Sequence, residues 1–187
     1  MLEGKTENLS VLEKDDVDFM VDCLNNPDFW GEYEPIADPN TGQISKSQWM
    51  KSFDNPGSFD VFIKWAPFVI QKKDGTRIGL MWHFVNQPYN LMEIVCLLVH
   101  SERGKGYGTE ATQLMIDYLF LSKNISRIQT VTNVRNKPAQ RTLEKAGFKI
   151  EGTIRKLLFV RGTLTDFYVL SILREEWKEP RILTKTT

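Results

Sequence analysis

Residues 94–121 constrain the fold more than any other part of this sequence. The apolar run Ile94–Val99 is followed by a glycine-rich stretch, Arg103–Thr109, and then by apolar residues repeating at helical spacing. Three alternating glycines lack β-carbons, so successive backbone N–H groups can converge on an anion at the positive end of the helix dipole. Arg103 and Lys105 add positive charge. This pattern predicts a strand, a loop and a helix that together bind a phosphate or pyrophosphate.

Two well-known phosphate loops fit this stretch poorly. The Walker pattern needs Lys followed by Ser or Thr directly after its last glycine, whereas Gly108 is followed by Thr109 and Glu110. The dinucleotide fingerprint needs Gly-x-Gly-x-x-Gly in a parallel unit, and the spacing here is Gly-x-Gly-x-Gly after a predicted antiparallel meander. A glycine-rich turn that merely begins a helix is the structural alternative.

The remaining pattern predicts one mixed α/β domain spanning residues 1–187, because no repeat, linker or low-complexity segment divides the chain. An Asp-Gly turn between two apolar runs indicates a hairpin, and a third strand follows it directly. The expected strands are 8–12, 68–71, 78–85, 92–99, 125–132, 148–160 and 163–173. The expected helices are 16–25, one following Ser45, 106–121 and 138–146, with Asp15 as the cap of the first.

Residues 28–60 combine turn formers with more aromatic area than a plain linker needs. Trp30 and Tyr33 belong to this stretch. We interpret it either as a flap that faces the acceptor or as a packed loop. Residues 178–187 are polar, so we expect a flexible tail.

Composition excludes several classes of protein. The 24 Lys and Arg residues balance 24 Asp and Glu residues, which argues against a nucleic acid as a direct ligand. No window approaches the length of a membrane helix, so we expect a cytoplasmic protein without membrane contact. Cys23 and Cys96 are expected as buried free thiols, and His83 and His100 have no metal-ligand spacing, so no metal is expected.

A second motif follows the strand predicted at 125–132. Asn136 precedes a segment with Pro138 suited to a first helical turn and Gly147 suited to the position after the last turn. Asn136 could serve only as a helix cap, or it could bind the amides of an extended ligand between two strands.

These two motifs resemble those of the GNAT superfamily of N-acetyltransferases. Arg103-x-x-Gly106-x-Gly108 is similar to its acetyl-CoA loop, and the segment 136–148 is similar to its later motif. Residues 151–155 and 166–177 resemble the RimJ/RimL branch, which acetylates N-terminal α-amines of ribosomal proteins. The resemblance covers about residues 68–177, and residues 1–67 match only in outline.

The resemblance implies a GNAT-like domain with a mostly antiparallel, twisted sheet, splayed between two strands and flanked by about four helices. It implies acetyl-CoA as co-substrate and direct transfer to an amine. The implied cofactor-binding residues are Cys96, Leu97, Leu98, Arg103, Gly104, Lys105, Gly106, Tyr107, Gly108, Thr109 and Asn136. For the acceptor we expect Trp30, Tyr33, Glu34 and His83.

The catalytic acids that the resemblance would supply are missing. Leu143, Ala139 and Leu158 stand where the family or branch has a Tyr, a Ser and an acid. Expelling an unprotonated thiolate near pH 7 costs only about 2 kcal/mol, so this loss slows transfer without forbidding it. As general base we expect Glu93, acting through water.

Other readings of the candidate bases stay open. Glu93 could be a solvated carboxylate at a strand end, and His83 could be a structural histidine of the sheet. Asp166 could pair with Arg155 or Arg161 across the closing hairpin.

We expect an acetyl-CoA-dependent N-acetyltransferase acting on a protein N-terminal α-amine. A small-molecule amine such as a polyamine, an aminoglycoside or a metabolite is the first alternative, and a non-catalytic acyl-CoA-binding module is the second. A homodimer is left open.

Overall fold

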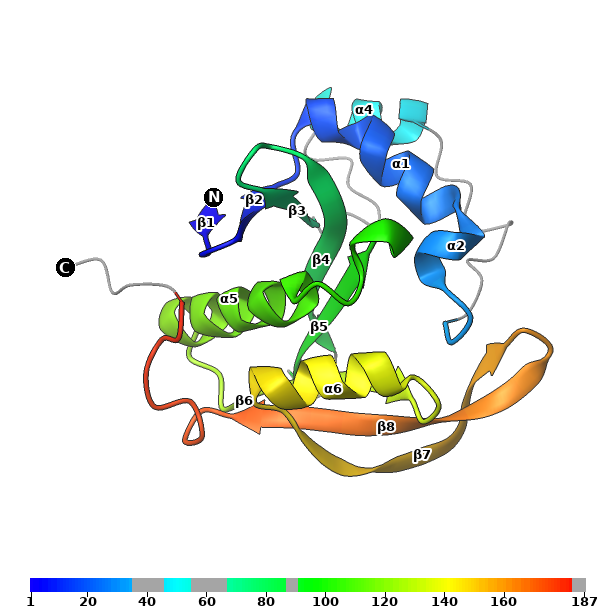
Figure 1. The fold of residues 1–187 in the computed structure, drawn as a ribbon, viewed down its shortest axis with the longest axis vertical. Coiled ribbons are helices and arrows are strands. Elements are labelled where there is room, and N and C mark those ends of the chain that lie inside the picture. The colour runs from blue at the N-terminus through cyan, green and yellow to red at the C-terminus, as the bar shows by residue number, and fades with distance from the viewer. Residues whose placement is uncertain (35–45, 55–66, 87–90, 183–187) are drawn as a thin grey trace.

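The computed structural model describes residues 1–34, 46–54, 67–86 and 91–182, which form an eight-stranded sheet with helices on both faces (Figure 1). The sheet order is β1-β2-β3-β4-β5-β6-β8-β7. The strands are β1 (Leu2–Glu3), β2 (Glu7–Val11), β3 (Phe68–Lys72), β4 (Arg77–Asn86), β5 (Leu91–Leu98), β6 (Arg127–Asn133), β7 (Lys149–Val160) and β8 (Thr163–Leu173). The helices are α1 (Val17–Asn25), α2 (Pro27–Trp30), α4 (Lys46–Asp54), α5 (Tyr107–Ser122) and α6 (Lys137–Ala146), with short 3-10 turns η1 (Lys14–Asp16) and η3 (His100–Glu102). The predicted mixed α/β class is confirmed.

Strand β5 lies at the centre of the sheet and has two different neighbours. On one side it pairs antiparallel with β4 over its whole length, from Gly79↔Leu98 to Asn86↔Leu91. On the other side its parallel pairing with β6 comprises Met92↔Ile128 and Glu93↔Gln129. Beyond these positions β6 continues to pair with β8 on its other edge but has no further partners in β5, so β5 and β6 diverge toward the C-terminal end of β5. This is the splayed pair that the resemblance implied.

Alternation along the strands divides the core between the two faces of the sheet. Met81 packs with α5 in one buried cluster, whereas its neighbours Leu80 and Trp82 pack with α1 in the other. In β5, Ile94 and Cys96 lie on the α5 face, and Val95 and Leu97 lie on the α1 face. Helices α5 and α6 therefore cover one face, and α1, α2 and α4 cover the other (Figure 1).

The closing hairpin of β7 and β8 is confirmed, and it extends past α6 toward the segment that follows α2 (Figure 1). Its register shifts between Ile154 and Leu158, where Lys156 has a φ of 52°. The backbone N–H of Lys156 donates to Asp166 Oδ1 (2.8 Å). The Asp166 carboxylate thus stabilises the irregular turn of β7 through the backbone, rather than pairing with Arg155 or Arg161 as considered from the sequence.

The N-terminal helix begins differently from the prediction. Asp15 is not its cap: η1 precedes α1, with Glu13 as the N-cap of η1 and Asp16 as that of α1, and the Glu13 N–H donates to Asp16 Oδ2 (2.9 Å). Asp16 is buried and also accepts from Arg77 Nε (2.6 Å), so this residue, rather than Asp15, links the start of α1 to β4. Within the predicted flap the structure contains α2 and α4, and Trp49 of α4 is buried. Residues 35–45 and 55–66, including the expected cap Ser45, lie outside the described residues.

The C-terminal segment is attached to the domain as far as Ile182, unlike the flexible tail expected from residue 178. Asp117 of α5 is buried, and its carboxylate accepts from Trp177 Nε1 (2.8 Å) and from the backbone N–H groups of Arg181 (3.0 Å) and Ile182 (2.9 Å). The guanidinium of Arg181 donates to the carbonyl of Ala146, at the end of α6 (3.1 Å). This segment thus joins the ends of α5 and α6, and residues 183–187 lie outside the described part of the chain.

Candidate functional site

The glycine loop between η3 and α5 has the backbone geometry of an anion site. Gly104 and Gly106 have φ values of 76° and 99°, and a β-carbon at either would meet nothing within 4 Å. The positive φ values therefore favour glycine at both positions, although there is room for a side chain. Among the described residues no protein acceptor is present for the N–H groups of residues 104–108. These N–H groups lie at the positive end of the 16-residue helix α5 and are suited to a diphosphate.

The widening gap between β5 and β6 exposes main-chain groups next to this loop. The N–H of Val99 donates to the carbonyl of Ile78, on the β4 side. Since backbone groups alternate in direction along a strand, those of Leu97 also face β4, and those of Cys96 and Leu98 face the gap. The Leu98 carbonyl accepts from Arg103 Nε (3.0 Å). Cys96 is thus the residue of β5 whose main chain is best placed to pair with an extended ligand in the gap.

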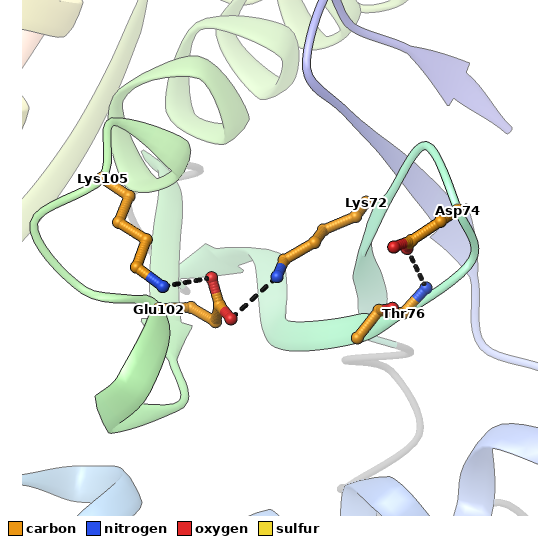
Figure 2. Close-up of polar contacts among 5 residues, drawn as sticks. All are labelled: Lys72, Asp74, Thr76, Glu102 and Lys105. Carbon is orange, nitrogen blue, oxygen red and sulfur yellow. Dashed lines mark hydrogen bonds and ion pairs between the residues drawn. The ribbon is translucent and has the colours of Figure 1, made fainter.

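Charged side chains link the loop to the neighbouring hairpin. Glu102 of η3 lies between two lysines: its Oε1 accepts from Lys72 Nζ (2.8 Å) and its Oε2 from Lys105 Nζ (3.1 Å) (Figure 2). These contacts lower the pKa of Glu102 and raise that of Lys72. Lys72 Nζ also lies 5.8 Å from the centre of the Tyr107 ring. Lys105 could be predicted from the sequence but Lys72 could not, because only the strand register brings β3 beside the loop.

Arg103 begins the loop, but its guanidinium points away from the loop amides. Its Nη2 donates to the carbonyls of Phe29 (2.6 Å) and Asp28 (3.3 Å), in α2, while Nε holds the carbonyl of Leu98. Burial lowers the pKa of the guanidinium. The side chain of Arg103 is therefore turned to protein carbonyls, and its backbone N–H donates to the His100 carbonyl (3.2 Å), so the loop N–H groups that could hold a pyrophosphate are those of residues 104–108.

Asn136 performs the structural role considered for it. It is the N-cap of α6, and its Oδ1 accepts from the N–H of Ala139 (3.2 Å). Gly108 of α5 packs closely against α6, since a β-carbon there would lie 3.4 Å from Thr142 Cγ2. The side-chain amide of Asn136 is the part that could bind a ligand, and this role stays a prediction.

Residues 26–34, which we call the acceptor-side segment, lie against the mouth of the gap. Asn133 at the end of β6 is fully buried and donates through Nδ2 to the Tyr33 carbonyl (3.2 Å). Arg161, in the turn of the β7–β8 hairpin, donates to the Gly31 carbonyl (3.2 Å). Asn133 was not predicted from the sequence, where its signal is a polar amide at the end of a strand. Backbone anchoring by separate elements brings Trp30, Tyr33 and Glu34 to one region of the molecule.

Glu34 is the last described residue of the acceptor-side segment, and its role in binding the acceptor stays a prediction. Burial raises the pKa of its carboxyl to about 7. A carboxyl whose pKa lies near the working pH can both accept and release a proton. The bond between Asn133 and the Tyr33 carbonyl holds the peptide unit that leads into Glu34.

The structure does not bring His83 together with Trp30, Tyr33 and Glu34. His83 lies on the α5 face, with ring centres 6.0 Å from Phe68 and 6.0 Å from Tyr118, whereas Trp30 packs on the α1 face. Burial lowers the pKa of His83, so it is mostly neutral at pH 7. These contacts favour the structural reading of this histidine.

Glu93 lies where β5 and β6 begin to diverge. Its Oε1 accepts from Gln129 Nε2 (2.8 Å), across the parallel pair. Its catalytic role stays a prediction.

Among the described residues no group of His, Cys, Asp and Glu could hold a metal ion, and none of the helices described is long and apolar enough to cross a membrane.

Comparison with known proteins assigns the family. Residues 8–149 match the family model described as an acetyltransferase (GNAT) domain. The chain belongs to the GNAT acetyltransferase family. An uncharacterized N-acetyltransferase p20 from Bacillus licheniformis is 26% identical over 176 residues, covering 92% of this chain and 96% of that protein. The chain is an acetyl-CoA:amine N-acetyltransferase, as the two sequence motifs implied.

Solved structures of GNAT enzymes share the fold. Spermidine N-acetyltransferase from Vibrio cholerae, in complex with CoA and spermine, has a TM-score of 0.76 at 21% identity, covering 93% of this chain and 99% of that one. Ribosomal-protein-S5-alanine acetyltransferase from Vibrio fischeri has a TM-score of 0.76 at 20% identity, covering 95% and 98%. At these identities the two structures establish the fold, and they act on different amines.

Acetyl-CoA is the co-substrate of the family, and the residues present fit it. The N–H groups of residues 104–108 suit its diphosphate, and the main chain of Cys96 suits its amide-containing arm. Bound there, acetyl-CoA supplies an acetyl thioester. No side chain is needed for either contact.

Proposed function

We propose that this enzyme acetylates the α-amine at the N-terminus of a protein. The observation that carries the proposal is Glu34, a carboxyl with a pKa of about 7 in the acceptor-side segment. Moving a proton to it from an α-ammonium group, with a pKa near 8, costs about 1.4 kcal/mol. The same transfer from a lysine-like ammonium costs about 4.6 kcal/mol. The α-amine is thus easier to neutralise by about 3.2 kcal/mol whatever the base, and a single weak base leaves the lysine-like ammonium mostly charged, so the site suits α-amines.

The protein contributes positioning, a proton acceptor and a donor for the developing oxyanion. Glu34 accepts the proton of the incoming ammonium, and the neutral amine then attacks the thioester carbonyl. The main-chain N–H of Cys96 is the candidate donor to the developing oxyanion. Glu93 is the second candidate for the base, acting through water.

The thiol of Cys96 supports direct transfer rather than an acyl-cysteine intermediate. Burial and the charge of Glu7 raise the pKa of this thiol to about 12. A thiol is nucleophilic only as the thiolate, which is scarce at pH 7 for such a group. With Leu143, Ala139 and Leu158 in place of an acid, the CoA thiolate leaves unprotonated, at a cost of about 2 kcal/mol.

A polyamine is the second candidate acceptor. Asp28, Glu32 and Glu34 give the acceptor-side segment an acidic character that suits a cationic amine, and a spermidine acetyltransferase shares the fold. A polyamine carries several ammonium groups, so acidic side chains would attract it more strongly than a single α-amine.

A panel of acceptors tests the proposal. CoA release would be followed with peptides bearing free N-termini, the same peptides with blocked N-termini, spermidine and free lysine. We expect turnover with free N-termini and none with blocked ones. Faster turnover of spermidine than of any peptide would establish the second candidate instead. The thermal shift with acetyl-CoA is measured first. An unchanged melting temperature at saturating acetyl-CoA would contradict the assignment of acetyl-CoA as the acetyl donor.

A further inference from the structure

Arg103 makes an unusual set of contacts for the first residue of a phosphate-binding loop. Nε and Nη2 donate to carbonyls at the end of β5 and in α2, as described above. The third nitrogen, Nη1, lies 3.1 Å from the position that a β-carbon on Gly31 would occupy. Two of the three guanidinium nitrogens therefore donate to protein carbonyls, and the third lies beside Gly31, so the guanidinium packs against the acceptor-side segment.

Gly31 shows that this approach is close and specific. It ends α2 with a φ of 79°, and its N–H donates to the Pro27 carbonyl (3.1 Å). A side chain at Gly31 would be strained by its backbone conformation and would also meet the guanidinium. The glycine thus lets Arg103 reach the carbonyls of Asp28 and Phe29.

The acceptor-side segment is held by separate side chains at successive carbonyls. Arg103 binds those of Asp28 and Phe29, Arg161 binds that of Gly31, and Asn133 binds that of Tyr33. Of these side chains, Arg103 is the one that comes from the glycine loop. Arg103 belongs to the glycine loop through its backbone and is hydrogen-bonded to α2 through its side chain. It therefore links the glycine loop to the residues that lead to Glu34.

We infer that Arg103 is a positioning residue that couples the glycine loop to the acceptor-side segment, so that acetyl-CoA on the loop amides orders residues 26–34. The inference rests on the proposed function, because it takes the diphosphate to lie on residues 104–108. When acetyl-CoA immobilises the loop backbone, the Cα of Arg103 is held in place. The guanidinium then holds the carbonyls of α2 more firmly, which reduces the motion of α2. By reciprocity, an acceptor that orders the segment tightens acetyl-CoA binding by the same factor.

Two substitutions separate the geometry of Arg103 from its charge. Arg103→Lys keeps the positive charge but lacks the planar fork that spans several carbonyls. Arg103→Gln removes both the charge and the fork. Lys178→Gln, which removes an exposed cation near the C-terminus, is the control for the loss of charge.

The first measurement needs no acceptor and no variant. Amide hydrogen exchange of the wild-type protein is recorded with and without acetyl-CoA, together with the acetyl-CoA Kd from calorimetry. We expect acetyl-CoA to protect residues 104–108 and also residues 26–34. Protection of the loop without protection of residues 26–34 would overturn the coupling while leaving the proposed function intact. Absence of any acetyl-CoA binding would refute both.

The variants then assign the coupling to Arg103. Both Arg103→Lys and Arg103→Gln should lose the acetyl-CoA-induced protection of residues 26–34 and raise the acceptor KM by about 5- to 20-fold. Their acetyl-CoA Kd should stay within about threefold of wild type, since the guanidinium faces carbonyls and not phosphates. If lysine preserves the Kd and glutamine weakens it strongly, the side chain acts as a phosphate cation and the inference is wrong.

Discussion

Glu7 in β2 is the buried group whose ionisation should most affect stability. The residue is fully buried, and its Oε1 has no hydrogen-bond partner among the described residues. Burial, reinforced by the nearby charge of Glu110, raises its pKa from 4.5 to about 8. At pH 7 the folded protein therefore holds a proton on Glu7 that the unfolded chain releases.

The magnitude follows from proton linkage. Protonating a carboxyl of pKa 4.5 at pH 7 costs about 3 kcal/mol, and Glu7→Gln should avoid most of this cost because it is neutral and of similar shape. With a raised folded-state pKa, the contribution of Glu7 is complete below pH 4.5, declines as the pH rises toward 8, and is lost above it. Between pH 6 and pH 9 the wild type should lose about 3 kcal/mol relative to Glu7→Gln.

The assay is thermal or urea unfolding of both proteins at half-unit steps from pH 6 to pH 9. For a chain of this size about 3 kcal/mol corresponds to about 6–12 °C in Tm. Glu3→Gln, at an exposed position, controls for the loss of a negative charge. If wild type and Glu7→Gln lose stability in parallel over this range, Glu7 is not protonated in the folded protein and the argument from burial is refuted.

Other predictions concern the site. Gly106→Val should abolish acetyl-CoA binding in calorimetry, because a φ of 99° is strongly unfavourable for valine, and full retention would contradict the loop assignment. Asn136→Ala should lose about 1 kcal/mol of unfolding free energy with its helix cap, whereas Asn136→Asp keeps an acceptor for the Ala139 N–H and should retain stability in urea unfolding. If the side-chain amide of Asn136 also binds acetyl-CoA, Asn136→Asp should weaken that binding. An unchanged acetyl-CoA Kd would show that Asn136 is only a helix cap. Glu34→Gln should lower kcat/KM and remove the rise of activity with pH near 7, and a preserved pH profile would move the base to Glu93.

The backbone of the glycine loop and of α6 could be predicted from the sequence because the signals there are local. Alternating glycines, a proline in a first turn and Gly147 after the last turn each dictate a backbone conformation by themselves. The strands of the meander and the closing hairpin were predicted for the same reason, with ends that differ by a few residues.

The acceptor half depended on contacts that are distant in sequence. Arg103 was expected to face phosphates, but its partners Asp28 and Phe29 lie 75 and 74 residues away. His83 was grouped with Trp30 by residue type, and only the alternation of β4 assigns it to the opposite face. Likewise, no local pattern indicates that Lys72 reaches Glu102 or that Asn133 reaches Tyr33.

The bonds to Asp117 decide where this protein can be shortened or extended in the laboratory. A purification tag placed after Thr187 leaves the buried carboxylate with the indole and both backbone N–H groups that it accepts from. A truncation before Arg181 would remove two of those three donors to a buried side chain of α5, and should destabilise the protein. Shortened versions of the protein should therefore keep every residue up to Ile182, even though the glycine loop lies at the other end of α5.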